Sequence, residues 1–237
     1  MSCLLCMDTS TDVCSAAVCC DGETLFDRED HAGPNHAERL GSFVDEALSY
    51  VDGHRLALDA VAVCGGPGSY TGLRIGVSMA KGICYGRGLR LVAVPTPELL
   101  CVAALDSAEI ASAGDKDTAL LCPMLDARRM EVYAALYDMS MTCVREIRAD
   151  IVDGDTYRAF LDERRVFFFG DGAAKCMEAI GHPNARLVDN IMPLARNIMP
   201  LAERRLADGR TEDVAYYEPF YLKDFVAGKP RTIKDMI

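Results

Sequence analysis

Uninterrupted apolar runs recur along the chain, and each of them ends at a turn signal. Residues 3–7 precede Asp8 and a group of hydroxyl residues, and a second run, Val13 to Cys19, ends at Asp21-Gly22. Two such runs around a polar turn predict a β-hairpin, followed by a third strand near Thr24 to Phe26. Further runs predict strands over 60–63, 89–94, 120–125, 131–137 and 166–169. Helical patterns lie between these runs, and such alternation predicts an α/β fold.

The most regular helical pattern covers residues 36–51. Its apolar side chains recur with helical spacing and form one stripe, made by Leu40, Phe43, Val44, Ala47, Leu48 and Val51. Asn35 is a predicted N-cap, and Glu38 stands three residues later, as in a capping box. We interpret His36 as a surface or interface residue, because the position four residues later holds Leu40 rather than a second metal-binding histidine.

A glycine-rich stretch, Gly65 to Gly76, follows the strand at 60–63 and opens a second helix. Strand, glycine-rich turn and helix is the arrangement of a phosphate-binding loop. However, Gly72 is followed by Leu73 rather than by the Lys of a Walker A loop, and the glycine spacing differs from the dinucleotide fingerprint. The stretch therefore predicts either a nucleotide loop or a tight turn that allows close helix packing.

The second helix is apolar on nearly every side, and Gly72, Gly76 and Ala80 recur along it every four residues. A helix that is apolar all round has to be covered all round. Its own sheet can cover one side, so the pattern predicts either a partner on the other side or a central core helix. The small residues predict a groove into which another backbone fits.

Two turns carry acids that could hold a metal and phosphates. Asp8, Thr9 and Ser10 follow the first strand, and Gly170, Asp171 and Gly172 follow the strand at 166–169. The alternative for the first turn is an Asx or Ser/Thr turn, which uses the same residues for local hydrogen bonds. A histidine metal site is not expected, because no two of the four histidines are four residues apart.

Composition narrows the class of protein. At 237 residues and 50% hydrophobic, the chain can bury a full core. Gly114 to Asp117 predicts a break between lobes at 1–113 and 114–237, with the tail packing back on the first lobe.

The net charge of −11 argues against a main role in binding nucleic acid. A basic island, Arg74, Lys81, Arg87 and Arg90, predicts a complementary acidic surface, a bound phosphate or ordinary solubilising charge.

The segments outside the core pattern also carry expectations. Eleven cysteines without secretory or membrane-spanning patterns predict reduced thiols in a cytoplasmic protein. A metal or redox role for the Cys3–Cys6 pair is not expected. The basic segment Lys223 to Lys234 is expected either to be mobile or to bind a partner.

Several motifs together resemble the TsaB (YeaZ) family, the dimerisation subunit of the bacterial machinery for tRNA threonylcarbamoyladenosine. The most specific is Gly66-Pro67-Gly68-Ser69-Tyr70-Thr71-Gly72-Leu73-Arg74-Ile75-Gly76. The others, in register along the chain, are residues 5–11, 36–40, 125–128, 131–133, 170–172 and 219–222. The resemblance implies a two-lobed fold of the actin/Hsp70/sugar-kinase (ASKHA) class, with mixed sheets flanked by helices.

The resemblance also implies an accessory subunit without intrinsic catalysis, cofactor or metal. It implies pairing with a TsaD-like catalytic subunit, action with a TsaE-like ATPase, indirect contact with tRNA, no membrane, and a homodimer when the chain is alone. Thr9 stands where active relatives of the fold have a glycine, and the histidine pair of the catalytic subunit is missing. The alternative is an active ATPase or phosphotransferase that uses Asp8 and the loop at 170–172; a metallopeptidase lacks ligands.

Two sets of residues follow from these arguments. The expected partner interface is formed by His36, Leu40, Phe43, Val44, Ala47, Thr71, Gly72, Leu73, Ile75, Gly76, Met79 and Ala80. The residues of a vestigial nucleotide site are Asp8, Thr9, Ser10, Gly170, Asp171 and Gly172.

Overall fold

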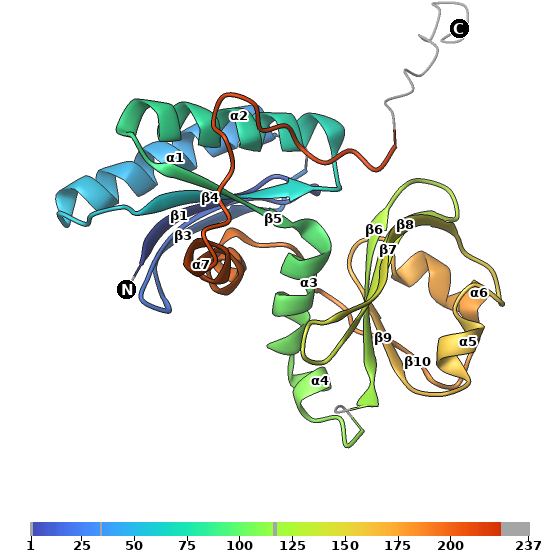
Figure 1. Cartoon of the computed structure of the whole chain (residues 1–237). Helices are drawn as coiled ribbons and strands as arrows, with labels where there is room; N and C mark the ends of the chain where they lie inside the picture. The colour runs from blue at the N-terminus through green and yellow to red at the C-terminus, as the bar shows by residue number, and fades with distance from the viewer. Residues whose placement is uncertain (1, 34, 116–117, 224–237) are drawn as a thin grey trace, which may run out of the picture.

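A computed structural model describes residues 2–33, 35–115 and 118–223. Two five-stranded mixed sheets form the two lobes of the molecule (Figure 1). The first sheet has the order β3-β2-β1-β4-β5 and consists of β1 (Cys3–Asp8), β2 (Cys14–Cys20), β3 (Glu23–Asp30), β4 (Ala60–Gly66) and β5 (Arg90–Pro95). The second has the order β10-β9-β6-β7-β8 and consists of β6 (Leu120–Asp126), β7 (Glu131–Asp138), β8 (Cys143–Ile151), β9 (Val166–Phe169) and β10 (Ala185–Leu187).

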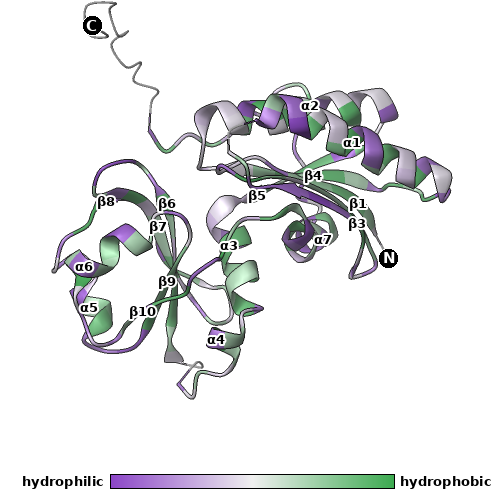
Figure 2. Ribbon diagram, turned by 180° about the vertical axis from the view of Figure 1, so that it is seen from behind, coloured by the Kyte–Doolittle hydropathy of each residue, from purple (hydrophilic) through white to green (hydrophobic). Residues whose placement is uncertain are grey.

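Helices cover both faces of the first sheet. The long helices α1 (His36–Gly53) and α2 (Tyr70–Arg87) lie on one face, and η3 (Ala195–Ile198) with α7 (Met199–Ala207) lies on the other (Figure 1). This double cover explains why β4, and β1 up to Met7, are uninterrupted apolar runs, since a strand buried on both faces has no solvent side for polar residues. Figure 2 shows the contrast with β3, the polar strand at the sheet edge.

The second sheet is covered in the same way. On one face lie α5 (Arg158–Leu161), η2 (Ala174–Cys176) and α6 (Met177–Ile180). On the other face lie α3 (Thr96–Leu105) and α4 (Ala108–Ala111), between the two lobes (Figure 1). Within the described residues, no helix is long and apolar enough to cross a membrane.

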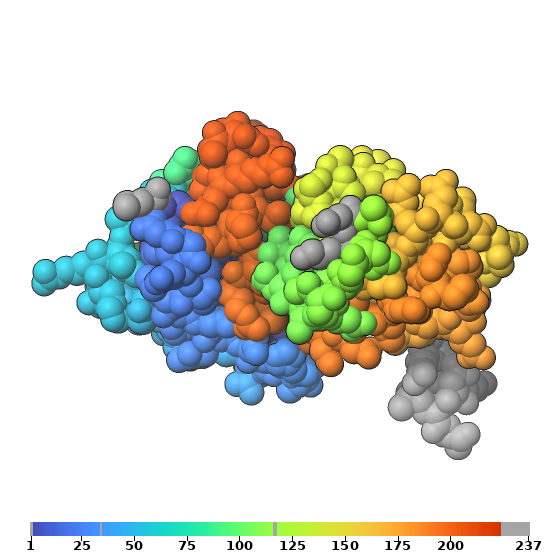
Figure 3. All heavy atoms as spheres, turned by 90° about the horizontal axis from the view of Figure 1, so that it is seen from below, coloured from blue at the N-terminus to red at the C-terminus, as the bar shows by residue number. Residues whose placement is uncertain are grey.

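The C-terminal part of the chain returns to the first lobe. The side chains of Ala195, Ile198 and Ala202 are fully buried against the strands of the first sheet. Further on, Glu212 N–H donates to the Leu91 carbonyl and Phe220 N–H donates to the Gly65 carbonyl, both at 2.8 Å. Figure 3 shows this orange-red segment lying against the blue N-terminal strands. The first lobe is therefore built from both ends of the described chain.

The local expectations are met except in three places. The first hairpin and its third strand are present, with β3 longer than expected. The Asn35 side chain makes no capping hydrogen bond on α1. The Ser69 side chain does cap α2, by accepting from Gly72 N–H at 3.2 Å, and this helix begins at Tyr70.

The missing cap at Asn35 is the first departure from the sequence-based predictions. The second concerns the cysteines, and the third concerns His36, which is described with the candidate site. Cys3 and Cys20 form a disulfide, so the expectation of reduced thiols is wrong for this pair. The reason is the hairpin register, which places these two residues directly opposite each other on β1 and β2. Nine cysteines are free, and all of these except Cys143 are buried. The basic segment beyond Lys223 lies outside the described residues.

Candidate functional site

The turn of the first hairpin is buried beneath the N-terminal ends of α1 and α2. Thr9 Oγ1 donates a hydrogen bond to the Gly72 carbonyl at 2.7 Å, and Ser69 N–H donates to the Ser10 carbonyl at 2.7 Å. His36 Nε2 lies 2.8 Å from the Thr11 carbonyl oxygen. These bonds connect the turn to both long helices, so turn and helices form one packed unit.

The small residues of α2 are used in this internal packing. A Cβ on Gly72 would overlap the Thr9 carbonyl oxygen, and a Cβ on Gly76 would overlap Thr9 Oγ1. Ala80 is fully buried against the first sheet and α1. The sequence suggested that these residues form a groove for a partner. They face the chain's own turn and sheet instead, so a large side chain at Gly76 or Ala80 would disturb the fold itself.

Much of the expected interface is interior for the same reason. His36 is only 3% exposed, because its ring packs between the turn and Gly72, so it is not a surface residue. The other interior positions of that set are Leu40, Val44, Ala47, Gly72, Leu73, Gly76 and Ala80. Phe43, Ile75 and Met79 are half-buried, and Thr71 is exposed. Of the expected interface, a partner can therefore contact only these four side chains directly.

The outer face of α2 carries residues that the sequence argument did not single out. Tyr85 is 88% exposed, although its side chain is large and mostly apolar. Gly82 and Gly86 are exposed, and a Cβ on either would meet no atom of the described residues within 4 Å. On α1, Gly41 has the same open space. The signal in the sequence was present, because glycines inside a helix lower its stability and need a reason.

Asp8 is fully buried at the start of the turn. Its Oδ1 accepts from Ser10 N–H at 3.3 Å, while Oδ2 has no hydrogen-bond partner among the described residues. Burial is the main cause that raises the pKa of this carboxyl from 3.8 to about 7, against the lowering effect of its hydrogen bonds to Ser10. The Asp8 carboxyl therefore combines a raised pKa with a place closed to solvent.

The resemblance to active members of the fold implies phosphate and metal at this turn, and the residues do not fit that role. The Thr9 side chain and the Gly72 backbone fill the space beside the turn, and Asp8 is sealed behind them. Within the described residues, no cluster of three His, Cys, Asp or Glu side chains could hold a metal ion. The turn works as a packing element between strands and helices.

The second predicted loop, residues 170–172, lies in the other lobe and is also held by internal hydrogen bonds. Gly172 N–H donates to the Met124 carbonyl at 3.0 Å, and Asp171 Oδ1 accepts from Asp126 N–H at 2.9 Å. Gly170 has a φ of +98°, which favours glycine. Burial raises the pKa of Asp171, and Asp126 and Asp12 raise it further. Because Asp12 belongs to the first turn, the two predicted turns lie near enough for their acids to interact.

The four cations of the basic island interact with acceptors and rings of the chain itself. Arg87 makes two hydrogen bonds of 2.9 Å with the Asp52 carboxylate of α1. Arg74 lies 4.2 Å from the ring centroid of Tyr70, and its Nε donates to the Tyr221 hydroxyl at 3.2 Å. Lys81 Nζ donates to the carbonyls of Ala215 and Tyr217. Arg90 Nε reaches the Asp59 carbonyl at 3.4 Å. Arg74, Lys81 and Arg87 therefore hold α1, α2 and the C-terminal segment together.

Comparison with known proteins places this arrangement in a family. A family model described as TsaD: tRNA N6-adenosine threonylcarbamoyltransferase matches residues 30–229. The Escherichia coli tRNA threonylcarbamoyladenosine biosynthesis protein TsaB is 28% identical, over 95% of this chain and 96% of that protein. The protein of that name from Haemophilus influenzae is 26% identical, over 95% of each chain. The structure of YeaZ from Pseudomonas aeruginosa covers 94% of this chain and all of that one, at 25% identity with a TM-score of 0.74.

The two packed sheets and these matches define a two-lobed protein of the actin/Hsp70/sugar-kinase class, which confirms the predicted fold. Within that class, the chain belongs to the TsaB (YeaZ) family of the tRNA threonylcarbamoyladenosine biosynthesis pathway.

Proposed function

We propose that this protein is a non-catalytic subunit that pairs with a TsaD-like catalytic subunit through the outer face of α1 and α2. In this assignment it supports threonylcarbamoyl transfer to the adenosine beside the tRNA anticodon, together with a TsaE-like ATPase. It contacts tRNA only indirectly, and it forms a homodimer when no sister subunit is present. The observation that carries the proposal is the outer surface of α2 around Gly82, Tyr85 and Gly86, which is rich in glycine and which no other part of the described chain covers.

The composition of that face favours a helical partner. Ile75, Met79 and Ile83 lie half-buried along α2, and Tyr85 extends into solvent. A mid-helix glycine is about 1 kcal/mol less favourable than alanine. Gly82 has no internal contact that requires this, so close approach by another backbone is a sufficient reason. Two long helices from each of two related chains can then form a four-helix interface.

The closed first turn supports the non-catalytic part of the proposal. In a phosphotransferase, glycine backbone at this position would let phosphate approach the turn. Here Thr9 forms a buried hydrogen bond in that space, and Asp8 has no access to solvent. The rival assignment, an active ATPase or phosphotransferase, requires this turn to open.

The decisive experiment mixes the chain with the TsaD-like subunit of the same organism and measures association by analytical ultracentrifugation. We expect a stable heterodimer, which Gly82→Phe abolishes because the ring occupies the space that the partner backbone needs. Gly114→Phe is the matched control, since Gly114 is also exposed with open space around it but lies in the loop after α4. Equal association of both variants would contradict the interface.

The non-catalytic assignment has a separate readout. The isolated chain with ATP and Mg²⁺ is expected to release no phosphate above a buffer blank, whereas the rival assignment requires turnover. If hydrolysis is found, Asp8→Asn must abolish it before the activity is assigned to this turn.

A further inference from the structure

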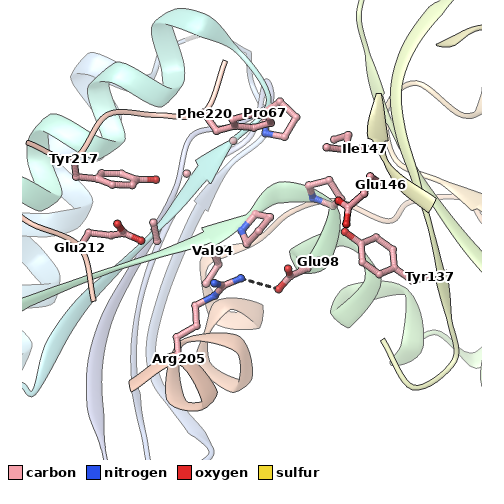
Figure 4. Close-up of a pocket in the computed structure, with 15 residues that line it drawn as sticks. Pro67, Val94, Glu98, Tyr137, Glu146, Ile147, Arg205, Glu212, Tyr217 and Phe220 are labelled. Carbon is pink, nitrogen blue, oxygen red and sulfur yellow. Dashed lines mark hydrogen bonds and ion pairs between the residues drawn. The ribbon is translucent and has the colours of Figure 1, made fainter. Parts of the chain in front are cut away.

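A cavity of about 380 Å³ lies between the two lobes, where β4 and β5 end (Figure 4). The first lobe contributes Gly65, Gly66 and Pro67, and the second contributes Tyr137, Glu146 and Ile147. Residues 212–220 close a further side on their way across the first lobe. Its volume is in the range of small-molecule sites. Among the described residues, no member of the first turn or of the loop at 170–172 lines it.

The charges around this cavity do not balance. Arg205 is the one cation among its described lining residues, and Glu98 neutralises it at 3.0 Å (Figure 4). The other two acids in the lining, Glu146 and Glu212, make no ion pair within the described part of the chain. An anion would have to displace Glu98 from Arg205, whereas a cation would meet two carboxylates that have no counter-charge.

Aromatic rings form much of the remaining wall. Figure 4 shows the Tyr217 hydroxyl pointing toward the cavity and Phe220 beside Pro67 at its end. Phe220 is 50% exposed, which is unusual for a large apolar side chain. Burial raises the pKa of Tyr137 and of Tyr217 above its ordinary value, so both phenols stay neutral. Neutral rings beside carboxylates are the environment that holds organic cations in proteins.

These rings are held in place before any ligand arrives. The backbone carbonyl of Tyr217 accepts from Lys81 Nζ at 2.9 Å, and Phe220 N–H donates to the Gly65 carbonyl at 2.8 Å. Gly65 and Gly66 are themselves in contact with this segment, because a Cβ on either would overlap Tyr217 or Phe220. A fixed wall lowers the entropy that binding would otherwise lose.

We propose that this cavity binds a small organic cation, an ammonium or guanidinium group on a short carbon chain. Glu146 and Glu212 supply the counter-charges from opposite lobes, and Tyr217 and Phe220 contact the carbon chain and the face of the cation. The cation comes either from a free small amine or from a basic side chain of a polypeptide. The proposal is independent of the partner interface on α1 and α2.

The test uses calorimetric titration of the full chain with two cationic probes, agmatine and the peptide acetyl-Gly-Arg-Gly-amide. The same peptide with citrulline in place of arginine is the neutral control, since citrulline keeps the shape and loses the charge. We expect at least one cationic probe to bind and the citrulline peptide to bind at least about tenfold more weakly. Binding of agmatine alone indicates a free amine, and binding of the arginine peptide alone indicates a polypeptide side chain; either result supports the cation site.

Variants then locate the site. Glu146→Gln and Glu212→Gln are each expected to weaken binding about tenfold, because each removes one charge without removing volume. Glu23→Gln on β3 is the matched control, an exposed acid outside the cavity lining, and it should bind like the parent. Circular dichroism confirms that the variants are folded, and ultracentrifugation with the TsaD-like subunit checks that pairing is unaffected. The proposal is overturned if neither cation binds at millimolar concentration, if citrulline binds equally well, or if both Gln variants bind unchanged.

Discussion

Helix α2 carries small residues on an inner, packed face and on an outer, exposed face, and the two faces have different environments. On the inner face, Gly72 and Gly76 lie against Thr9, and a Cβ would overlap its atoms. On the outer face, Gly82 and Gly86 have open space around the Cβ position. The same residue type therefore serves internal packing on one side and leaves a surface uncovered on the other. The comparison teaches that a small-residue pattern shows where close approach occurs but not what approaches.

The largest expected difference between the two faces is in folding. Gly72→Leu should lower the free energy of unfolding by about 4 kcal/mol or more, because the new side chain overlaps the Thr9 backbone and has no direction in which to relax. Gly82→Leu, a substitution in the same helix, should leave stability unchanged or slightly higher. Urea denaturation followed by circular dichroism measures both. Similar losses in the two variants would remove the distinction between the faces.

Asp8, beneath the inner face, should make stability depend on pH. Its pKa is raised to about 7 in the folded chain, so between pH 4 and pH 7 the folded state binds more protons than the unfolded state. Stability should therefore fall as pH rises through this range, by roughly 2–3 kcal/mol between pH 5 and pH 8. Asp8→Asn should remove this part of the fall. Urea midpoints of both proteins at the two pH values test the prediction, and parallel pH profiles would contradict it.

A smaller effect is expected from the hydrogen bond that joins the turn to α2. Thr9→Val keeps the shape of the side chain but leaves the Gly72 carbonyl without this donor, which should cost about 1–2 kcal/mol. Thr71→Val is the matched control, because Thr71 is exposed one residue away from Gly72. The difference between the two midpoints in urea gives the contribution of the buried bond, and no difference would show that the bond is not important for stability.

The smallest effect is a gain on the outer face. Gly82→Ala should raise the free energy of unfolding of the isolated chain by about 0.5–1 kcal/mol, because alanine has the higher helix propensity and the space is open. If the outer face pairs as proposed, the same substitution should weaken association with the TsaD-like subunit. Thermal denaturation of the monomer and ultracentrifugation of the mixture measure the two effects. A loss of monomer stability would mean that Gly82 has an internal role after all.

Much of the fold could be predicted from the pattern of residues. Buried strands such as β4, and β1 up to Met7, are apolar, and α1 has a single stripe, so their type and position follow from local sequence. The hairpin register that joins Cys3 to Cys20 could not be predicted, because strand pairing depends on the turn between the strands and not on the cysteines. The burial of His36 could not be predicted either, because its ring is enclosed by the first turn and by Gly72, which are distant from it in the sequence.

The sequence by itself determined the class of fold, the family motif from Gly66 to Gly76 and the presence of a close-packed helix behind it. Only the tertiary structure decided which neighbours that helix has. The turn from Asp8 to Asp12 is more than fifty residues from Gly72 along the chain, yet it occupies the inner face of α2. A local pattern records the size and polarity of a surface. The identity of what covers it is set by long-range contacts, and these placed the Thr9 turn against one face and left the glycines of the other uncovered.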